Sequence, residues 1–166
     1  AVGANALDAN TTGSYNSAFG THAGSSITTG TLNSVFGDYA LAGTTTASGN
    51  SAFGQAALGT NSTGANNSAF GKDALYANTT GPNNTAVGNI ALTTNTTGSE
   101  NVAIGMNAMY SNTTGEDNVA VGYASLYNNT TADNNTAVGY YALLANTTGA
   151  GNVAVGRNAL DNNTTA

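Results

Sequence analysis

The sequence contains no cysteine and a single histidine, His22. Without cysteine the chain can form no disulfide, and one imidazole cannot supply the ligands of an ordinary zinc or transition-metal site. A nucleophile–base–acid arrangement cannot be built around this histidine either, because it occupies a position that varies along the chain. We therefore expect that the protein is not an enzyme and holds no such metal.

Positive charge is almost absent. Lys72 and Arg157 are the only basic residues, against eight acidic ones, and the formal net charge is -6. Proteins that bind nucleic acid or anionic membranes carry a basic patch, so we expect neither partner. Long apolar runs are also missing, since none approaches the roughly 18 residues of a membrane span. This segment is therefore not expected to insert into a membrane.

What the sequence has is a strict repeat. A glycine returns every 17 residues without insertion or deletion, and the members of this column are Gly3, Gly20, Gly37, Gly54, Gly71, Gly88, Gly105, Gly122, Gly139 and Gly156. A fixed period of this size predicts a solenoid. We expect residues 1–166 to form a single array of nearly ten coils. Neither end carries an atypical capping unit, so the array is expected to be part of a longer fibre.

Each glycine follows a short segment that we interpret as a strand, for example Val102-Ala103-Ile104. The residue before the glycine is always large and apolar, and the residue two positions earlier compensates for it. Phe is paired with Ser in the first half of the chain, and Val or Ile with Val or Thr in the second. Residues two apart on a strand share a face. A larger residue at one position accompanies a smaller residue at the other, and this conservation of total volume indicates close packing. We therefore expect this face, with Val121, to be buried.

The residue between them is alanine in every unit except Val35. On a strand it points to the opposite face. A face that carries only small side chains predicts close approach by a neighbouring chain, and hence a homotrimer or another lateral assembly. The residues of this predicted interface are Ala86, Ala103, Ala120, Ala137 and Ala154. The alternative is that the alanines pack inside a narrow coil.

A second apolar pair follows the glycine, as in Ala74-Leu75 and Ala142-Leu143. We interpret it as a second short strand with leucine pointing inward, such as Leu126. The fold expected is therefore an all-β parallel solenoid, or β-roll, of two short strands per coil. The N-T-T-G segment that closes each coil supplies turn-forming residues. It also matches the N-glycosylation sequon, although turn formation in every coil explains it.

One asparagine column has no exception. Stacked coils would place its members one strand spacing apart, close enough for a hydrogen-bonded amide ladder. The alternative is a row of ligand-binding amides. The members of this predicted ladder are Asn16, Asn33, Asn50, Asn67, Asn84, Asn101, Asn118, Asn135 and Asn152.

Two groups of surface residues stand out toward the C-terminus. Tyrosines form two columns, and Tyr123, Tyr140, Tyr110 and Tyr127 are candidates for surface contact with a glycan or a neighbouring chain. Their alternative role is cross-strand packing. Four carboxylates, from Glu100, Glu116, Asp117 and Asp133, are expected at one corner of three coils. Calcium could bridge them, and the alternative is a solvated acidic turn.

Segments such as Asn101-Val102-Ala103-Ile104-Gly105 and Asn118-Val119-Ala120-Val121-Gly122 resemble the N-S-V-A-I-G repeat of YadA-like heads of trimeric autotransporter adhesins. Similar repeats occur in phage tail fibres. The resemblance covers every unit, although the unit here is longer and carries a regular N-T-T-G segment. It implies a left-handed parallel β-roll, three chains packed side by side, and an outer surface that binds a host or matrix component. It implies no catalytic residue.

Two functions follow from these observations. The first is a structural and adhesive fibre segment, a stiff rod on the surface of a bacterium or virion that contacts a host-surface or matrix component, which could be a glycan. The second is an ice-binding solenoid, because Thr-rich parallel coils can present an array of hydroxyl groups. Adjacent residues on a strand point to opposite faces, so at most one threonine in each coil would face water, and this narrow array argues against ice binding.

Overall fold

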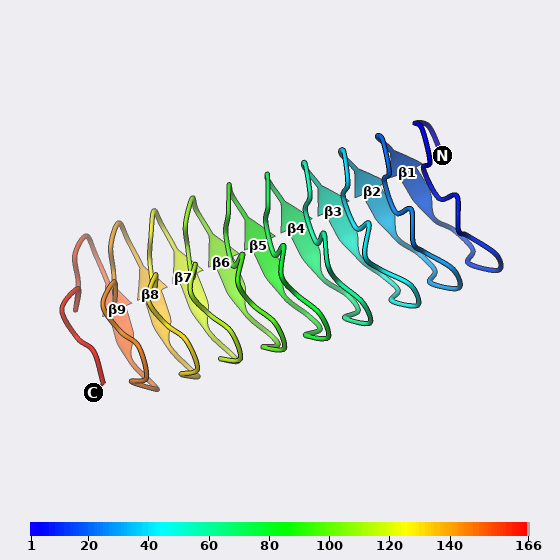
Figure 1. Ribbon diagram of the computed structural model, residues 1–166. Coiled ribbons are helices and arrows are strands. Elements are labelled where there is room, and N and C mark those ends of the chain that lie inside the picture. The colour runs from blue at the N-terminus through cyan, green and yellow to red at the C-terminus, as the bar shows by residue number, and fades with distance from the viewer. Residues whose placement is uncertain (166) are drawn as a thin grey trace.

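Nine short strands lie side by side in one parallel sheet, in the order in which they occur along the chain. The computed structural model describes residues 1–165. The strands are β1 (Ser17–Phe19), β2 (Ser34–Phe36), β3 (Ser51–Phe53), β4 (Ser68–Phe70), β5 (Thr85–Val87), β6 (Val102–Ile104), β7 (Val119–Val121), β8 (Thr136–Val138) and β9 (Val153–Val155). The coils stack along one axis, with the termini at opposite ends (Figure 1). This architecture confirms the predicted all-β parallel solenoid.

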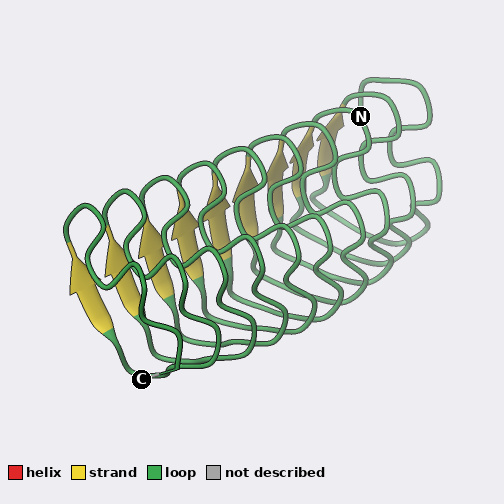
Figure 2. Cartoon of the chain, turned by 60° about the vertical axis from the view of Figure 1, so that its left-hand side comes forward, coloured by secondary structure: helices red, strands yellow, loops and turns green. Residues whose placement is uncertain are grey.

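The register repeats the sequence period. In the β6–β7 pair, Val102 lies beside Val119, and Ala103 lies beside Ala120. Figure 2 shows the strands on one wall of the solenoid, while turns and loops make up the rest of each coil. Because the coils superimpose residue on residue, each sequence column becomes a row of like side chains along the axis. No helix among residues 1–165 is long and apolar enough to cross a membrane.

The glycine column is required by the backbone. Gly105 has φ of 132°, a region that only glycine adopts readily. An added Cβ would lie 2.5 Å from the carbonyl oxygen of Gly122 in the next coil. Close stacking of coils therefore excludes any side chain at this corner.

The orientation predicted for the strands is wrong. The alanines face inward, and Ala86, Ala103, Ala120 and Ala137 have no exposed surface. The flanking residues face outward, so that Ile104 is 39% exposed and Val121 is only partly buried. Alanine is retained because leucine and two columns of asparagine already fill the interior, not because a neighbouring chain approaches it. The predicted interface of Ala86, Ala103, Ala120, Ala137 and Ala154 is therefore part of the core.

The second strand is also absent from the described coils, although its leucines are buried as predicted. Leu75 and Leu126 both have φ of 52°, and Ala124, two residues before Leu126, has φ of 49°. Alternating left-handed residues turn the chain and cannot form an extended strand. Coil-to-coil bonding continues nevertheless, because the backbone N–H of Leu75 donates to the carbonyl oxygen of Ala91 at 3.0 Å. The core therefore consists of one leucine and two alanines in a typical coil.

Candidate functional surfaces

The invariant asparagine column forms a ladder inside the solenoid. Asn84, Asn101, Asn118 and Asn135 have no exposed surface. The backbone N–H of Asn118 donates to Oδ1 of Asn101 at 3.0 Å, and Asn135 makes the same bond to Asn118 at 2.9 Å. Backbone donors take part, which the sequence pattern did not indicate. Burial removes the interior members of this column from any role as ligand-binding amides, and only Asn16 and Asn152 at its two ends are partly exposed.

A second asparagine ladder lies beside the first and was not predicted. It is formed by the asparagines that begin the N-T-T-G segments. Nδ2 of Asn112 donates to Oδ1 of Asn95 at 2.8 Å, and also to the carbonyl oxygen of Gly115 at 3.0 Å. Asn101 of the first ladder donates to the same Gly115 oxygen at 2.8 Å. The two columns thus share an acceptor in this coil. Because these amides are buried and hydrogen-bonded, a structural role accounts for the sequon-like segments.

The two threonines of each N-T-T-G segment have different environments. The first donates its hydroxyl to the backbone of the next coil, as Thr96 Oγ1 does to the carbonyl oxygen of Thr113 at 3.0 Å. The second is exposed in every coil. These exposed residues, which we call the outer threonine row, are Thr12, Thr29, Thr46, Thr63, Thr80, Thr97, Thr114, Thr131, Thr148 and Thr165.

The outward face of the sheet is largely apolar. Phe19, Phe36, Phe53 and Phe70 form a continuous stack along the axis, with neighbouring ring centroids 4.8 to 5.0 Å apart. Beyond Phe70 the row continues with aliphatic side chains. We call this row the outer apolar face; it consists of Phe19, Phe36, Phe53, Phe70, Val87, Ile104, Val121, Val138 and Val155. The volume compensation seen in the sequence therefore occurs on the outside of the coil.

The four carboxylates of the acidic corner do not converge on one point among the described residues. Glu100, Glu116 and Asp117 are exposed, and the Asp133 carboxylate accepts a hydrogen bond from the backbone N–H of Glu116 at 2.8 Å. Within residues 1–165 no three histidine, aspartate or glutamate side chains lie close enough together to hold a metal ion. Exposed carboxylates of like charge can separate into solvent, which opposes the predicted convergence.

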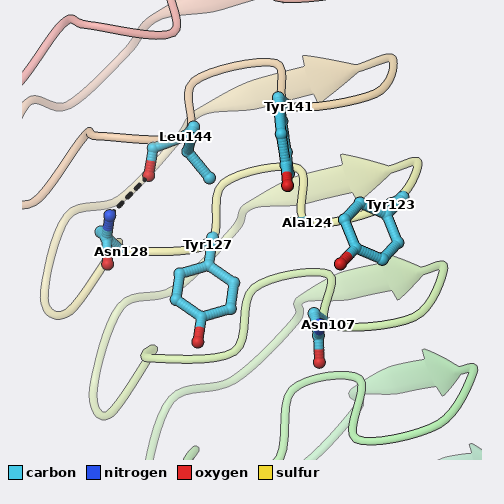
Figure 3. Close-up of a pocket in the computed structure, with 7 residues that line it drawn as sticks. All are labelled: Asn107, Tyr123, Ala124, Tyr127, Asn128, Tyr141 and Leu144. Carbon is cyan, nitrogen blue, oxygen red and sulfur yellow. Dashed lines mark hydrogen bonds between the residues drawn. The ribbon is translucent and has the colours of Figure 1, made fainter.

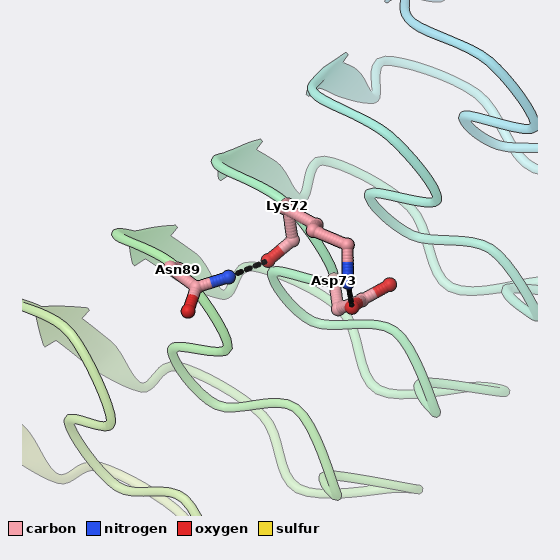
Figure 4. A network of polar contacts seen from close by, with 3 residues as sticks. All are labelled: Lys72, Asp73 and Asn89. Atoms are coloured by element: carbon pink, nitrogen blue, oxygen red, sulfur yellow. Dashed lines mark hydrogen bonds and ion pairs between the residues drawn. The ribbon is translucent and has the colours of Figure 1, made fainter.

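The two basic side chains do not form a positively charged patch. Lys72 Nζ lies 2.8 Å from the carboxylate of its neighbour Asp73, and the backbone carbonyl of Lys72 accepts a hydrogen bond from Asn89 (Figure 4). The Arg157 guanidinium lies 5.4 Å from the ring centroid of Tyr140. Each cation is therefore engaged locally. His22 is partly buried and stacks on Tyr39.

The tyrosines surround an open cavity of about 390 Å³. Tyr110 stacks on Tyr127 with ring centroids 5.0 Å apart, and Tyr123 stacks on Tyr140 at 5.2 Å. Tyr141, which was not among the predicted contact residues, tilts against Tyr140 at 46°. We call the cavity the tyrosine cleft; its lining residues are Asn107, Tyr123, Ala124, Tyr127, Asn128, Tyr141 and Leu144 (Figure 3).

The protonation of Tyr141 is set by its neighbours. A hydrogen bond with the Tyr140 side chain, together with burial and the charges of the neighbouring tyrosines, raises the pKa of Tyr141 to about 12. The single O–H of Tyr141 is therefore engaged with its tyrosine neighbours.

The comparisons with known proteins add no relative. No family model matches the chain, and neither a curated protein nor a solved structure was found to be similar to it.

Proposed function

We propose that this chain is a structural and adhesive segment of a fibre on a bacterial or virion surface, built from three copies that pack through their outer apolar faces. The observation that carries the proposal is the outer apolar face itself. Phe19 is 45% exposed and Phe70 is 40% exposed, although such side chains contribute to stability chiefly when removed from water. A continuous apolar surface is characteristic of an interface.

The volume compensation across this face supports a packed partner. Ser68 accompanies Phe70 in β4, whereas Val102 accompanies Ile104 in β6. A face in water has no need to trade volume between neighbouring positions, whereas an interface packed like a protein interior does. A second copy has the same period, so it can match this face at every coil. Closed cyclic symmetry repeats one contact around an axis, in keeping with the resemblance to trimeric adhesin heads.

The test is the oligomeric state of the chain and of two charged variants. Ile104→Glu places a carboxylate on the outer apolar face, and in a trimer the three like charges would cost several kcal/mol. We expect the wild type to be trimeric by light scattering, and the variant to dissociate while its far-ultraviolet spectrum stays β. Thr97→Glu, in the outer threonine row, is the control and should remain trimeric. A monomeric wild type contradicts the proposal.

Ice binding is the second candidate, and one observation favours it. The outer threonine row is exposed along the entire array, with one threonine in each coil. The neighbouring threonines donate their hydroxyls to the backbone, as Thr113 does to the carbonyl oxygen of Thr130, so the free array is only one residue wide. Thermal hysteresis in a freezing-point measurement would support ice binding, and its absence would leave the fibre proposal standing alone.

A further inference from the structure

We propose that the tyrosine cleft is a binding site for a neutral glycan. The inference deepens the adhesive part of the proposed function, because it assigns a class of ligand to the surface that the fibre presents. The cleft lies on the turns that follow the strands, and none of its lining residues belongs to the sheet. The cleft is therefore built from residues that are not part of the outer apolar face.

A small side chain at Ala124 leaves room for the cavity. Ala124 occupies the same column as Asn107 in the preceding coil and Tyr141 in the following coil. All three have left-handed backbones, with φ of 49°, 60° and 59°. In Figure 3 Ala124 lies between Tyr127 and Tyr123, and it is the smallest of the side chains that line the cavity. The volume of about 390 Å³ falls within the roughly 300–1,000 Å³ of small-ligand sites.

One residue that lines the cleft carries an unsatisfied acceptor. Oδ1 of Asn107 is buried and has no hydrogen-bond partner among the described residues. A buried polar atom without a partner costs about 1–3 kcal/mol, and such an atom in a native structure calls for an explanation. Because solvent does not reach this oxygen, a ligand hydroxyl donates to it once the Asn107 side chain turns toward the cavity. Nearby, Nδ2 of Asn128 donates to the carbonyl oxygen of Leu144 at 3.0 Å, which fixes the orientation of a second amide beside the cavity.

Two tyrosine rings in the cleft, those of Tyr127 and Tyr141, lack a stacking partner in the following coil of their own column. Tyr127 stacks on Tyr110, but the next residue in its column is Leu144, so the aromatic row ends at the cleft. Tyr141 has no aromatic neighbour in its own column. A tyrosine combines a large apolar ring with a polar hydroxyl. Pyranose rings present apolar C–H faces rimmed by hydroxyl groups, so they are complementary to such walls.

Charge favours a neutral glycan over an acidic one. No basic side chain lines the cleft as described, and the chain as a whole carries a net charge of -6. An anionic sugar would therefore enter without a cationic partner, and burial of an unpaired charge is costly.

The test is binding of neutral oligosaccharides to the full chain and to two tyrosine variants. Maltohexaose, cellohexaose, chitohexaose and mannohexaose serve as probes, with sialyllactose as the acidic comparison, in calorimetric and NMR titrations. Ala124→Tyr fills the cleft with the residue that the same column carries at position 141. Ala56→Tyr is the matched control, because Ala56 shares this column and has φ of 55° but lies outside the cleft.

We expect at least one neutral probe to bind, with a Kd in roughly the micromolar to millimolar range, and to shift the NMR signals of Asn107 and Tyr127. Ala124→Tyr should weaken that binding at least about tenfold, which corresponds to about 1.4 kcal/mol, and Ala56→Tyr should leave it unchanged. Absence of binding by every neutral probe at about 1 mM, equal binding by Ala124→Tyr, or tighter binding of sialyllactose would overturn the proposal. Light scattering on the same samples separates failure of the cleft from failure of the trimer.

Discussion

Asn101 and Asn118 are joined through a single oxygen. Oδ1 of Asn101 accepts one hydrogen bond from the backbone N–H of Asn118 at 3.0 Å and another from its Nδ2 at 3.2 Å. Both residues are fully buried. The same relation recurs between Asn135 and Asn152. A column of amides therefore secures the backbone of each coil to the side chain of the coil before it, which explains why no other residue occupies this position.

Replacing Asn101 with alanine should destabilise the solenoid locally. The change removes the acceptor of the buried Asn118 N–H and a donor to the Gly115 carbonyl. We expect a loss of about 2–4 kcal/mol, since each unpaired buried group costs roughly 1–3 kcal/mol. Hydrogen exchange of the Asn118 amide should accelerate more than exchange of the Asn152 amide. Asn89→Ala, on an exposed asparagine, is the control, and equal effects from the two substitutions would contradict a ladder that holds the coils together.

Gly105→Ala should be among the most damaging single substitutions in the chain. The backbone φ is 132°, and the new Cβ would lie 2.5 Å from the Gly122 carbonyl oxygen. We expect a loss of about 3–5 kcal/mol, or failure to fold, because strain and overlap with backbone act together. Chemical denaturation measures this loss.

The control for that substitution is Gly151→Asn. An ideal Cβ at Gly151 has no heavy atom within 4 Å, and the φ of 71° is one that asparagine tolerates. Asn134 already occupies the same column with φ of 60°. Stability should therefore change by no more than about 0.5 kcal/mol. A loss of stability as large as that of Gly105→Ala would contradict the interpretation that overlap with the next coil causes the loss at Gly105.

Tyr141 should lose its proton at a higher pH than an ordinary tyrosine. Its pKa is raised from 10.0 to about 12, so between these values the unfolded chain releases the proton before the native chain does. The unfolded state then binds fewer protons, and the free energy of unfolding falls as pH rises through this window. Tyrosinate absorbance should show a late component that Tyr141→Phe removes. Stability that rises over the same pH range in the wild type, relative to the variant, would contradict the assignment.

Much of the architecture follows from the sequence alone. Superposition of like residues every 17 positions requires stacked coils, because only stacking gives each column the same neighbours. The glycine column, the amide ladder of Asn101 and Asn118, and the inward-facing leucines such as Leu126 follow from that stacking. These features depend on local geometry and on contacts between adjacent coils, which an exact repeat makes visible in one sequence.

Only the tertiary structure decided which side of each strand faces inward. Alternation along Val119-Ala120-Val121 allows either orientation, and the volume compensation between the outer two residues is equally consistent with a core or with an interface. The cross-section of the coil settles the choice, because leucine and the two buried asparagine columns leave room only for a small side chain from the strand, which is alanine in every strand except β2 with its buried Val35. The tyrosine cleft was likewise invisible in sequence, since it depends on the absence of a side chain at Ala124 between Asn107 and Tyr141, in a turn whose left-handed backbone no periodic pattern reveals.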